Sequence, residues 1–437
     1  MNRFNYIGML AYVALSMSSC DDSFDVSSKA DGVLAVSQEG FNTLQSYNVG
    51  EKYTADLWIQ QGGLKSTASV VSFSVDKALL DSMNIADGTS YELLPADCYQ
   101  LTKSSVDIPA NERLLKGELT YDPAKIQELS GYDHLKYVLP LRATSSGMPF
   151  VSGRSVVLLG FKVSEPIVTI MNAGVEEINL AEVKELPVQI GVPFTNKWEI
   201  SCRLESRQSV IDAYNTAHGT YFSMLPSDAY AAPETPILHS GVNQVTALKD
   251  DVLPGNYMLP VQIAEVTSDA TIRADKDVYA AYSIIKEGDK LSKTDWKIVS
   301  FTTEEASGEG SNNGHAKHLI DGNVETFWHS RWQGGSDPLP YEIIIDMNHR
   351  VKIAQIELLP RGRGSNNPIK VIRFEASEDG TNWESIGQFG FTNQDAALKY
   401  YVKSSTARYI KLVIPDGVGN GTVAAIRELD VRGTVVN

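Results

Sequence analysis

An internal repeat in the first two-thirds of the chain constrains the fold more than any other feature. The segment Ala86–Tyr99 is matched by Ala217–Tyr230, 131 positions later, and both read Gly-Thr-x-x-x-x-Leu-Pro-x-Asp-x-Tyr. A second pair of matching segments, Tyr137–Leu141 and Tyr257–Val261, lies 120 positions apart. A repeat of this length corresponds to one structural unit, so the sequence predicts two related domains in tandem.

Both copies have the pattern of short strands. Apolar and polar residues alternate over Tyr53–Ile59 in the first copy and over Leu186–Val192 in the second, as in half-buried strands. Short helices are expected over Lys77–Asn84 and Ser209–Asn215. Because many short strands are separated by closely spaced turns, the sequence predicts an all-β fold in which each copy is a sandwich.

Two residue types in the repeats invite a functional interpretation. Asp97 and Asp228 are interpreted as turn residues that bond their local backbone, because a motif present twice is more simply a fold requirement than an active site. Cys98 and Cys202 do not occupy equivalent positions in the two copies. They are therefore expected to be buried free thiols rather than a disulfide.

The duplicated region resembles a tandem domain of unknown function that occupies the N-terminal part of glycan-utilisation lipoproteins of Bacteroidota. The resemblance covers about residues 30–285, and the Gly-Thr to Asp-x-Tyr segment is its most specific part. It implies two immunoglobulin-like sandwiches that act as spacers or binding modules.

The first residues have the pattern of an export signal. Arg3 is followed by the apolar run Ile7–Met17, which is too short to span a membrane, and by small residues before Cys20. This segment resembles the lipobox of bacterial lipoproteins, which implies that Cys20 is acylated as the mature N-terminus. The acidic run Asp21–Asp25 resembles the signal that sends such lipoproteins to the outer face of the outer membrane. The alternative is an ordinary secreted protein with a stray thiol.

These patterns predict an order of segments along the chain. The predicted bounds are 1–19 for a signal peptide, 20–30 for an acidic tether, 31–164 and 165–286 for the two sandwich repeats, and 287–437 for a further domain. The boundary between the two repeats follows a strand-like run that ends near Pro166, because proline cannot continue a hydrogen-bonded ladder.

A different pattern begins after the polar linker Glu287–Lys293. It opens with Trp296–Thr302 and passes through the turn Asp321-Gly322-Asn323 to Thr326 and Trp328. Further strands are expected over Tyr341–Asp346, Arg373–Ser377, Ala407–Ile414 and Ile426–Val431. In this order, these features resemble the discoidin domain, also called the coagulation factor V/VIII type C domain. The resemblance implies a jelly-roll β-sandwich of about eight strands with binding loops at one end.

The Asp321-Gly322-Asn323 turn is a candidate metal site. Glycine permits the tight bend, and carboxylate, carbonyl and hydroxyl oxygens are the ligands that calcium prefers. The resemblance implies a structural calcium ion held by backbone oxygens of His318 and Asn323 and by the side chains of Asp321, Thr326 and Glu428. The ion would tie the first loop to the last strand. The alternative is a turn without metal.

Two loops of the last domain have the residue types of a sugar site. Such sites pair an aromatic face with planar polar groups that bind hydroxyls. The residues expected to bind ligand, guided by sugar-binding members of the family, are His329, Trp332, Arg361, Arg363, Asn366, Asn367 and, as a second aromatic, Phe391.

Composition and motifs together favour a binding protein. The formal net charge of −16 disfavours nucleic acid but is compatible with neutral glycans. No catalytic motif of a glycosidase, acyl hydrolase or metallohydrolase was recognised, so we expect no enzyme activity. The first hypothesis is a lipid-anchored surface protein that binds glycan beside glycan-uptake partner proteins. The alternative is an adhesion or assembly protein that binds a protein or matrix partner.

Overall fold

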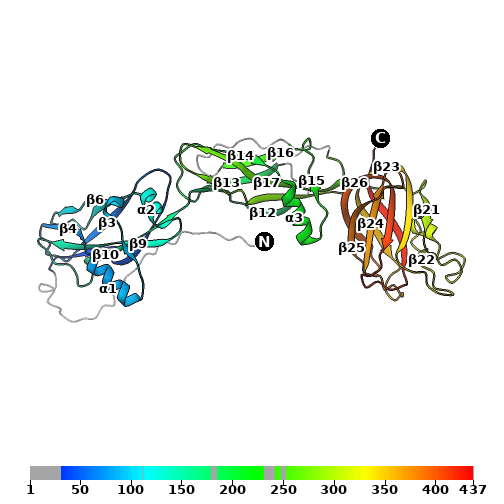
Figure 1. The fold of residues 1–437 in the computed structure, drawn as a ribbon, viewed down its shortest axis with the longest axis horizontal. Coiled ribbons are helices and arrows are strands. Elements are labelled where there is room, and N and C mark those ends of the chain that lie inside the picture. Colours follow the sequence, from blue (N-terminus) through cyan, green and yellow to red (C-terminus); the bar gives the residue numbers. More distant parts are fainter. Residues whose placement is uncertain (1–30, 111, 179–184, 231–241, 248–251, 437) are drawn as a thin grey trace. The chain divides into compact units, whose positions relative to one another are not determined.

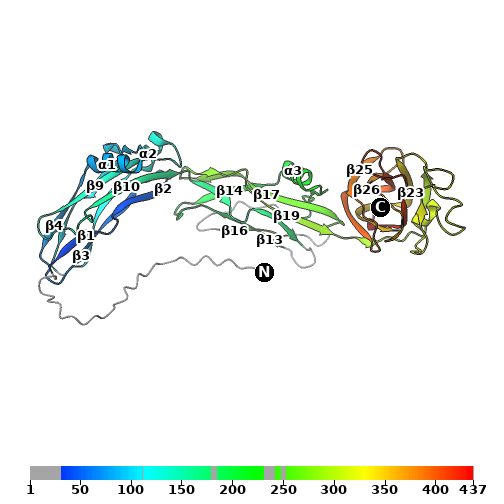
Figure 2. The same ribbon diagram turned by 90° about the horizontal axis from the view of Figure 1, so that it is seen from below.

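The structure is a computed structural model, and it describes residues 31–110, 112–178, 185–230, 242–247 and 252–436. The chain divides into two compact units, Met1–Glu165 and Pro166–Asn437. Figures 1 and 2 show the helices and strands of both units. The predicted all-β class is confirmed, because strands dominate each unit and the described residues contain three α-helices. No helix in this described part is long and apolar enough to cross a membrane. The predicted signal peptide and Cys20 lie outside the described residues.

The first unit is a sandwich of two sheets. One sheet has the order β1-β3-β8-β6, and the other has the order β2-β10-β9-β4-β7. Their bounds are β1 Val33–Val36, β3 Tyr53–Gly62, β8 Leu114–Tyr121, β6 Tyr99–Lys103, β2 Gly40–Tyr47, β10 Val156–Ser164, β9 Leu135–Ser145, β4 Ser69–Val75 and β7 Ser105–Ile108. The alternating residues Leu57 and Ile59 of β3 face Val71 and Phe73 of β4 in one buried core. The predicted period of two therefore places one face of each strand in the core.

Two helices accompany this sandwich. Helix α1 spans Lys77–Asp87, as the sequence predicted but one turn longer, and ends at Gly88 in the left-handed conformation. Helix α2, Pro123–Ser130, was not predicted; it begins where Asp122 accepts a hydrogen bond from the N–H of Ala124. Both lie on the side of β9 and β10 (Figure 2). Leu80 of α1 packs on residues of these two strands, so α1 covers apolar surface that the sheet would otherwise expose.

The second unit begins with the second repeat. Its two sheets have the orders β16-β13-β11-β18 and β12-β19-β17-β14. Their bounds are β16 Val242–Ala247, β13 Glu185–Gly191, β11 Ile167–Ile170, β18 Arg273–Ala274, β12 Gly174–Ile178, β19 Tyr279–Lys286, β17 Gly255–Ser268 and β14 Ile200–Glu205. Helix α3, Gln208–His218, packs Ile211 on Met258 of β17, as α1 does in the first repeat. The helix predicted over 209–215 is confirmed.

The repeated motif is explained by one asparagine in each copy. Asn84 donates its side-chain N–H to the carbonyl of Tyr91 at 2.8 Å, and its oxygen accepts from the hydroxyl of Thr89 and the N–H of Tyr91. Asn215 makes the same bonds to Thr220 and Phe222. The shared Gly-Thr therefore closes a loop after the helix, in agreement with a fold requirement.

The two matched segments of each repeat lie side by side. Strand β5, Glu92–Leu93, pairs in parallel with Tyr137 and Val138 of β9. Strand β15, Ser223–Met224, pairs in parallel with Tyr257 and Met258 of β17. The sequence repeat thus marks one spatial element that is built twice. Cys98 and Cys202 are both buried and free, as expected.

The remainder of the second unit is the C-terminal domain, a jelly-roll sandwich as predicted. Its strands pair in the order β20-β27-β23-β26-β24-β25, with β21 on β23 and β22 on β27. Their bounds are β20 Asp289–Lys290, β27 Ala425–Val435, β23 Tyr341–Pro360, β26 Leu398–Ile414, β24 Val371–Ser377, β25 Glu384–Gly390, β21 Lys297–Phe301 and β22 Trp328–His329. Trp328 is fully buried in its core. The long strands fix the ends of the loops that carry the candidate site.

Candidate functional site

Three of the predicted ligand residues meet around a carboxylate that the sequence analysis missed. The carboxylate of Glu309 accepts a hydrogen bond from the indole N–H of Trp332 at 2.9 Å and one from the guanidinium of Arg361 at 3.1 Å. Its Oε1 lies 3.8 Å from Nε2 of His329. The group formed by Glu309, His329, Trp332 and Arg361 is called the loop cluster below.

The position of Glu309 explains why it was missed. It lies between Gly308 and Gly310 in a loop without strand or helix periodicity, and it is 52 residues from Arg361 in sequence. A single acidic residue in a glycine-rich loop is ordinarily solvated. The signal that could have identified it is its place in a glycine- and asparagine-rich loop, a composition that binding loops often have, 20 positions before His329.

The imidazole of His329 is held in one tautomer. It is only 3% exposed, and its Nδ1 lies 2.6 Å from the carbonyl oxygen of Ser330, so Nδ1 must carry the proton. Burial lowers the pKa of His329 below the ordinary value of 6.5, and the nearby Arg361 lowers it further, although the Ser330 carbonyl and Glu309 oppose this. The ring is therefore neutral at pH 7, and Nε2 is an acceptor that faces the cluster.

Arg361 and Trp332 supply the other chemical types. The guanidinium of Arg361 lies over the ring of Phe327, with its Cζ 4.1 Å from the ring centroid, and the bond to Glu309 uses one of its five N–H groups. Trp332 is 43% exposed, more than any other tryptophan of the chain. The cluster thus combines an exposed aromatic ring with an acceptor, a donor and a carboxylate.

A second missed residue, Glu305, positions these loops. Its side chain is 1% exposed. Its Oε2 accepts from the N–H groups of Trp332 and Gln333 at 2.9 and 2.8 Å. Its Oε1 accepts from those of Ser307 and Gly308 at 3.1 and 2.8 Å. One buried carboxylate therefore joins the Glu309 loop to the Trp332 loop.

The charge of Glu305 is stabilised by these bonds. Burial raises the pKa of the Glu305 carboxyl, but the four backbone N–H groups lower it more, to about 2. Because the folded pKa is below the unfolded one, this group contributes stability above pH about 4.5, and that contribution is lost as pH falls towards 2. The loops are consequently held by an ionised carboxylate at every physiological pH.

The other predicted ligand residues are not among the partners of Glu309. Arg363 and Asn366 are exposed, and the backbone N–H of Arg363 donates to Asp395. Asn367 is 8% exposed and donates its side-chain N–H to the carbonyl of Ala425 at 2.6 Å. Phe391 is 4% exposed and belongs to the domain core. A stacking aromatic needs an exposed ring face, so the place of Phe391 in the core disagrees with the expectation that it is a second aromatic for a ligand. Asn367 connects its loop to Ala425 of β27.

The predicted metal turn gathers oxygen atoms. The carboxylate of Asp321 accepts from the N–H of Asn323 at 2.9 Å and from the hydroxyl of Thr326 at 2.8 Å. The same hydroxyl lies 2.8 Å from the carbonyl oxygen of Asn323. The ring of His318 bonds Asp321 through Nδ1 at 2.8 Å. These bonds draw the oxygens of Asp321, Asn323 and Thr326 into one turn.

Glu428 reaches this turn from β27. It is 3% exposed, and its pKa is raised to about 7, chiefly by burial and also by its contact with Asp321. Lys293 donates to one oxygen of Glu428 and lies 2.9 Å from Asp430, but Oε1 of Glu428 is buried with no hydrogen-bond partner in the described structure. A buried carboxylate oxygen beside a second carboxylate fits a bound cation. Among the described residues no group of three or more His, Cys, Asp or Glu forms a metal site, so a cation here depends on backbone and hydroxyl oxygens as well.

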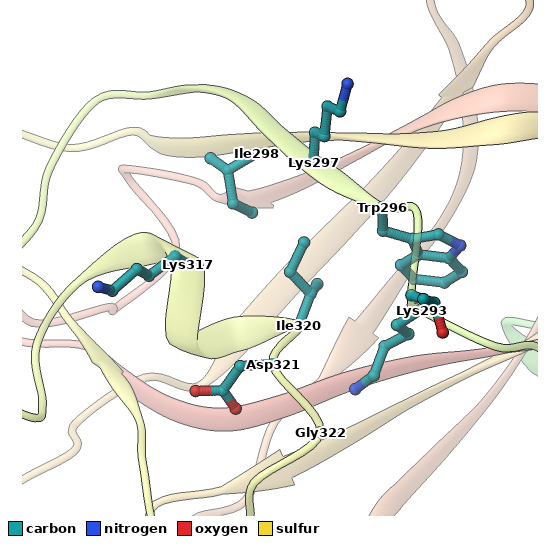
Figure 3. Close-up of a pocket in the computed structure, with 9 residues that line it drawn as sticks. Lys293, Trp296, Lys297, Ile298, Lys317, Ile320, Asp321 and Gly322 are labelled. Atoms are coloured by element: carbon teal, nitrogen blue, oxygen red, sulfur yellow. The ribbon is translucent and has the colours of Figure 1, made fainter.

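The turn borders a pocket of ≈ 770 Å³. Figure 3 shows Asp321 and Gly322 beside Lys293 and Trp296, while Lys297 and Lys317 point away from each other. The lysines therefore do not direct their charges at one point, and this pocket has less of the character of a ligand site than the loop cluster.

Two protein families match parts of this chain. The F5/8 type C domain family matches residues 301–429. A family described as an N-terminal domain matches twice, over residues 31–149 and 164–289. The resemblance to both families that the sequence suggested is confirmed.

Individual relatives match the last third of the chain. A sialidase from Micromonospora viridifaciens is 29% identical over 145 residues, which are 33% of this chain and 22% of that protein. The C-terminal domain of a chitobiase from Bacteroides fragilis is 99% identical and covers 34% of this chain and 100% of its own, with a TM-score of 0.34. A Clostridium perfringens domain solved in complex with GalNAc-β-1,3-galactose is 28% identical and covers 33% of this chain and 99% of its own, with a TM-score of 0.29. The chain thus spans about a fifth of the length of the sialidase.

Replacement of Glu305 by glutamine tests its role in the loops. The amide would turn an N–H group towards backbone donors, and charged hydrogen bonds of about 1.5–3 kcal/mol would be lost. We expect amide hydrogen exchange at residues 307–308 and 332–333 to rise by about tenfold or more, because tenfold corresponds to about 1.4 kcal/mol. Glu378→Gln, an exposed change in the same domain, should leave this exchange unchanged. Unaltered exchange in Glu305→Gln would show that the loops do not depend on the carboxylate.

Proposed function

We propose that the chain binds glycan through the loop cluster. The premise is that the chain belongs to the family whose N-terminal domain matches it twice, and that its last third is an F5/8 type C domain. The observation that carries the proposal is the convergence of Trp332, Arg361 and His329 on Glu309. The family match supports carbohydrate binding in general. The assignment to these residues rests on their chemistry.

Each group of the cluster suits one feature of a sugar. A pyranose has an apolar face of C–H groups, which stacks on an exposed indole such as Trp332. A hydroxyl both donates and accepts, so one hydroxyl can donate to Nε2 of neutral His329 and accept from Arg361. Glu309 holds both the indole and the guanidinium in place before a ligand arrives. Such preorganisation lowers the entropy cost of binding.

The carboxylate of the loop cluster and that of Glu305 favour binding over catalysis. A glycosidase needs a carboxylic acid whose pKa is raised so that it can donate a proton. Glu309 is ion-paired with Arg361, and the pKa of Glu305 is lowered to about 2. Although the B. fragilis relative is called a chitobiase, we propose that this chain captures polysaccharide or host glycan without cleaving it.

Isothermal titration calorimetry of the full chain with galactose and with GalNAc-β-1,3-galactose tests the sugar site. We expect saturable binding that Trp332→Ala weakens by about tenfold or more, since the stacking surface is removed. Phe301→Ala is the matched control, because Phe301 is equally exposed in the same domain, at 44% against 43%, but lies outside the cluster. Absence of heat with any sugar would instead favour an adhesion or assembly role with a protein partner.

The neutral state of His329 predicts a pH dependence. Because burial lowers its pKa below 6.5, more than half of the rings stay neutral down to pH 6.5, and sugar affinity should change by less than about twofold between pH 8 and 6.5. At lower pH the imidazolium forms, Nε2 becomes a donor, and affinity should fall. Titrations at several pH values measure this. A gain of affinity in acid would contradict the acceptor role of His329.

We further propose that the Asp321 turn holds a structural calcium ion through oxygens of His318, Asp321, Asn323, Thr326 and Glu428. The ion would supply positive charge between the carboxylate of Asp321 and the buried carboxylate of Glu428 and so tie the turn to β27. Its binding would be favourable to the fold, because the unfolded chain does not bring these oxygens together.

Calcium removal should therefore destabilise the C-terminal domain. At calcium concentrations of about 100 times Kd, binding contributes about 2.7 kcal/mol, so a chelator should lower the unfolding temperature measurably. Asp321→Asn should remove most of this calcium response, whereas Asp416→Asn, in an exposed loop, should retain it. Identical melting with calcium and with chelator would support the turn without metal.

We also propose that the protein is a lipoprotein of the outer membrane, anchored on the cell surface through Cys20 and acting beside glycan-uptake partner proteins. The apolar run, the small residues before Cys20 and the acidic run after it support this. Cys20→Ser should move the protein from the membrane fraction to the soluble fraction of the producing cells, as immunoblotting would show. A Cys20→Ser protein that stays in the membrane fraction would count against the anchor.

A further inference from the structure

The segment that connects the second repeat to the C-terminal domain is very short. Strand β19 ends at Lys286 and β20 begins at Asp289, so Glu287 and Gly288 alone separate them. Asp289 pairs with Gly433 in the C-terminal sheet. A Cβ atom at Gly288 would lie 2.3 Å from Cα of Gly433. The segment that the sequence suggested as a linker is thus largely part of the domain that follows.

Asn256 of β17 joins the second repeat to an irregular part of the C-terminal sheet. The pairing of β23 with β26 shifts register between Ile353 and Gln355, which leaves backbone groups outside the ladder. The side-chain N–H groups of Asn256 donate to the carbonyls of Ala354 and Val402 at 2.8 and 2.6 Å. Asn256 is 2% exposed. Carbonyls that a bulge releases are therefore satisfied by a residue of the other domain.

The backbone beside Asn256 contributes a further bond. The N–H of Asn256 donates to the hydroxyl of Ser404 at 2.9 Å. A Cβ atom at Gly255 would lie 2.3 Å from the same hydroxyl oxygen, so only glycine permits this approach.

Tyr221 makes a second, separate contact. Strand β25 is at the edge of the C-terminal sheet, and an edge strand has unpaired backbone groups. The Tyr221 hydroxyl donates to the carbonyl of Gln388 at 3.1 Å and accepts from its N–H at 2.8 Å. The Tyr221 ring lies 5.1 Å from that of Phe389, centroid to centroid. One side chain therefore caps an edge strand that would otherwise be open.

The first repeat shows that these residues are not needed for the repeat fold. Its loop after the helix is built by the same asparagine bonds, but it has Ser90 at the position of Tyr221. It has Leu135 and Lys136 at the positions of Gly255 and Asn256. The contacts are thus specific to the copy that precedes the C-terminal domain.

We propose that Tyr221, Gly255 and Asn256 lock the second repeat and the C-terminal domain into one rigid body in solution. The second repeat then determines the direction in which the loop cluster faces and is more than a flexible spacer. This inference does not depend on the identity of the ligand that the cluster binds.

Distance distributions between spin labels on the full chain test the proposal. One label pair is attached at Thr267→Cys in the second repeat and Glu378→Cys in the C-terminal domain, both exposed positions. A reference pair, Lys297→Cys and Glu378→Cys, lies within the C-terminal domain. All proteins contain Cys20→Ser, and burial raises the pKa values of Cys98 and Cys202 to about 11 and 12, which slows their labelling.

Without substitutions at Tyr221, Gly255 or Asn256, the label pair that spans the two domains should give a distance distribution as narrow as that of the reference pair. The double variant Tyr221→Phe, Asn256→Ala should broaden it about twofold, as expected of a short flexible connection. A second variant, Gly255→Leu with Asn256→Lys, introduces the residues of the first repeat and should broaden the distance distribution as well. Because the first repeat folds with these residues, this variant remains informative if the first variant misfolds. Tyr91→Phe in the first repeat is the matched control and should change nothing.

Two results would overturn the proposal. A broad distribution for the unmodified joint would show that the domains move independently. A narrow distribution in both joint variants would show that Tyr221, Gly255 and Asn256 do not hold the joint.

Discussion

The buried carboxylate of Glu305 is the interaction on which the candidate site depends. It replaces water for four backbone N–H groups of two loops that have no strand or helix to satisfy them. Because these bonds involve a charge, they are stronger than bonds between neutral groups. Because the Glu305 carboxylate bonds the backbone of both loops, Glu309 and Trp332 can be rigid although they lie outside regular structure. The site is thus a surface of preorganised side chains on an ordinary sandwich.

The same principle recurs in the repeats. Asn84 and Asn215 each satisfy loop groups after a helix, and the resulting loop is then available for other uses. In the second copy the loop presents Tyr221, which bonds an edge strand of the C-terminal domain. In the first copy Ser90 stands at that position. The two copies therefore share this loop, and the second copy makes a specific contact through a residue that the first copy lacks.

The sequence predicted the class of fold better than the site. Periodicity and the repeat identified strands, α1 and α3, because burial on one face leaves a period in the sequence. Helix α2 was missed because it is short and begins with a Pro that also suits a turn. Glu309 and Glu305 were missed because their roles come from groups distant in the chain, which a single loop sequence does not show. Phe391 was assigned to the ligand because its type is right for stacking, whereas the structure places it in the core.

The most direct test of the glycan-binding account is a crystal structure of the protein soaked with galactose. The account predicts the sugar ring on the indole of Trp332, with one hydroxyl between Nε2 of His329 and the guanidinium of Arg361. That arrangement would show that the loop cluster is a sugar site. A sugar bound elsewhere on the domain, or a cluster without sugar at saturating concentration, would contradict it.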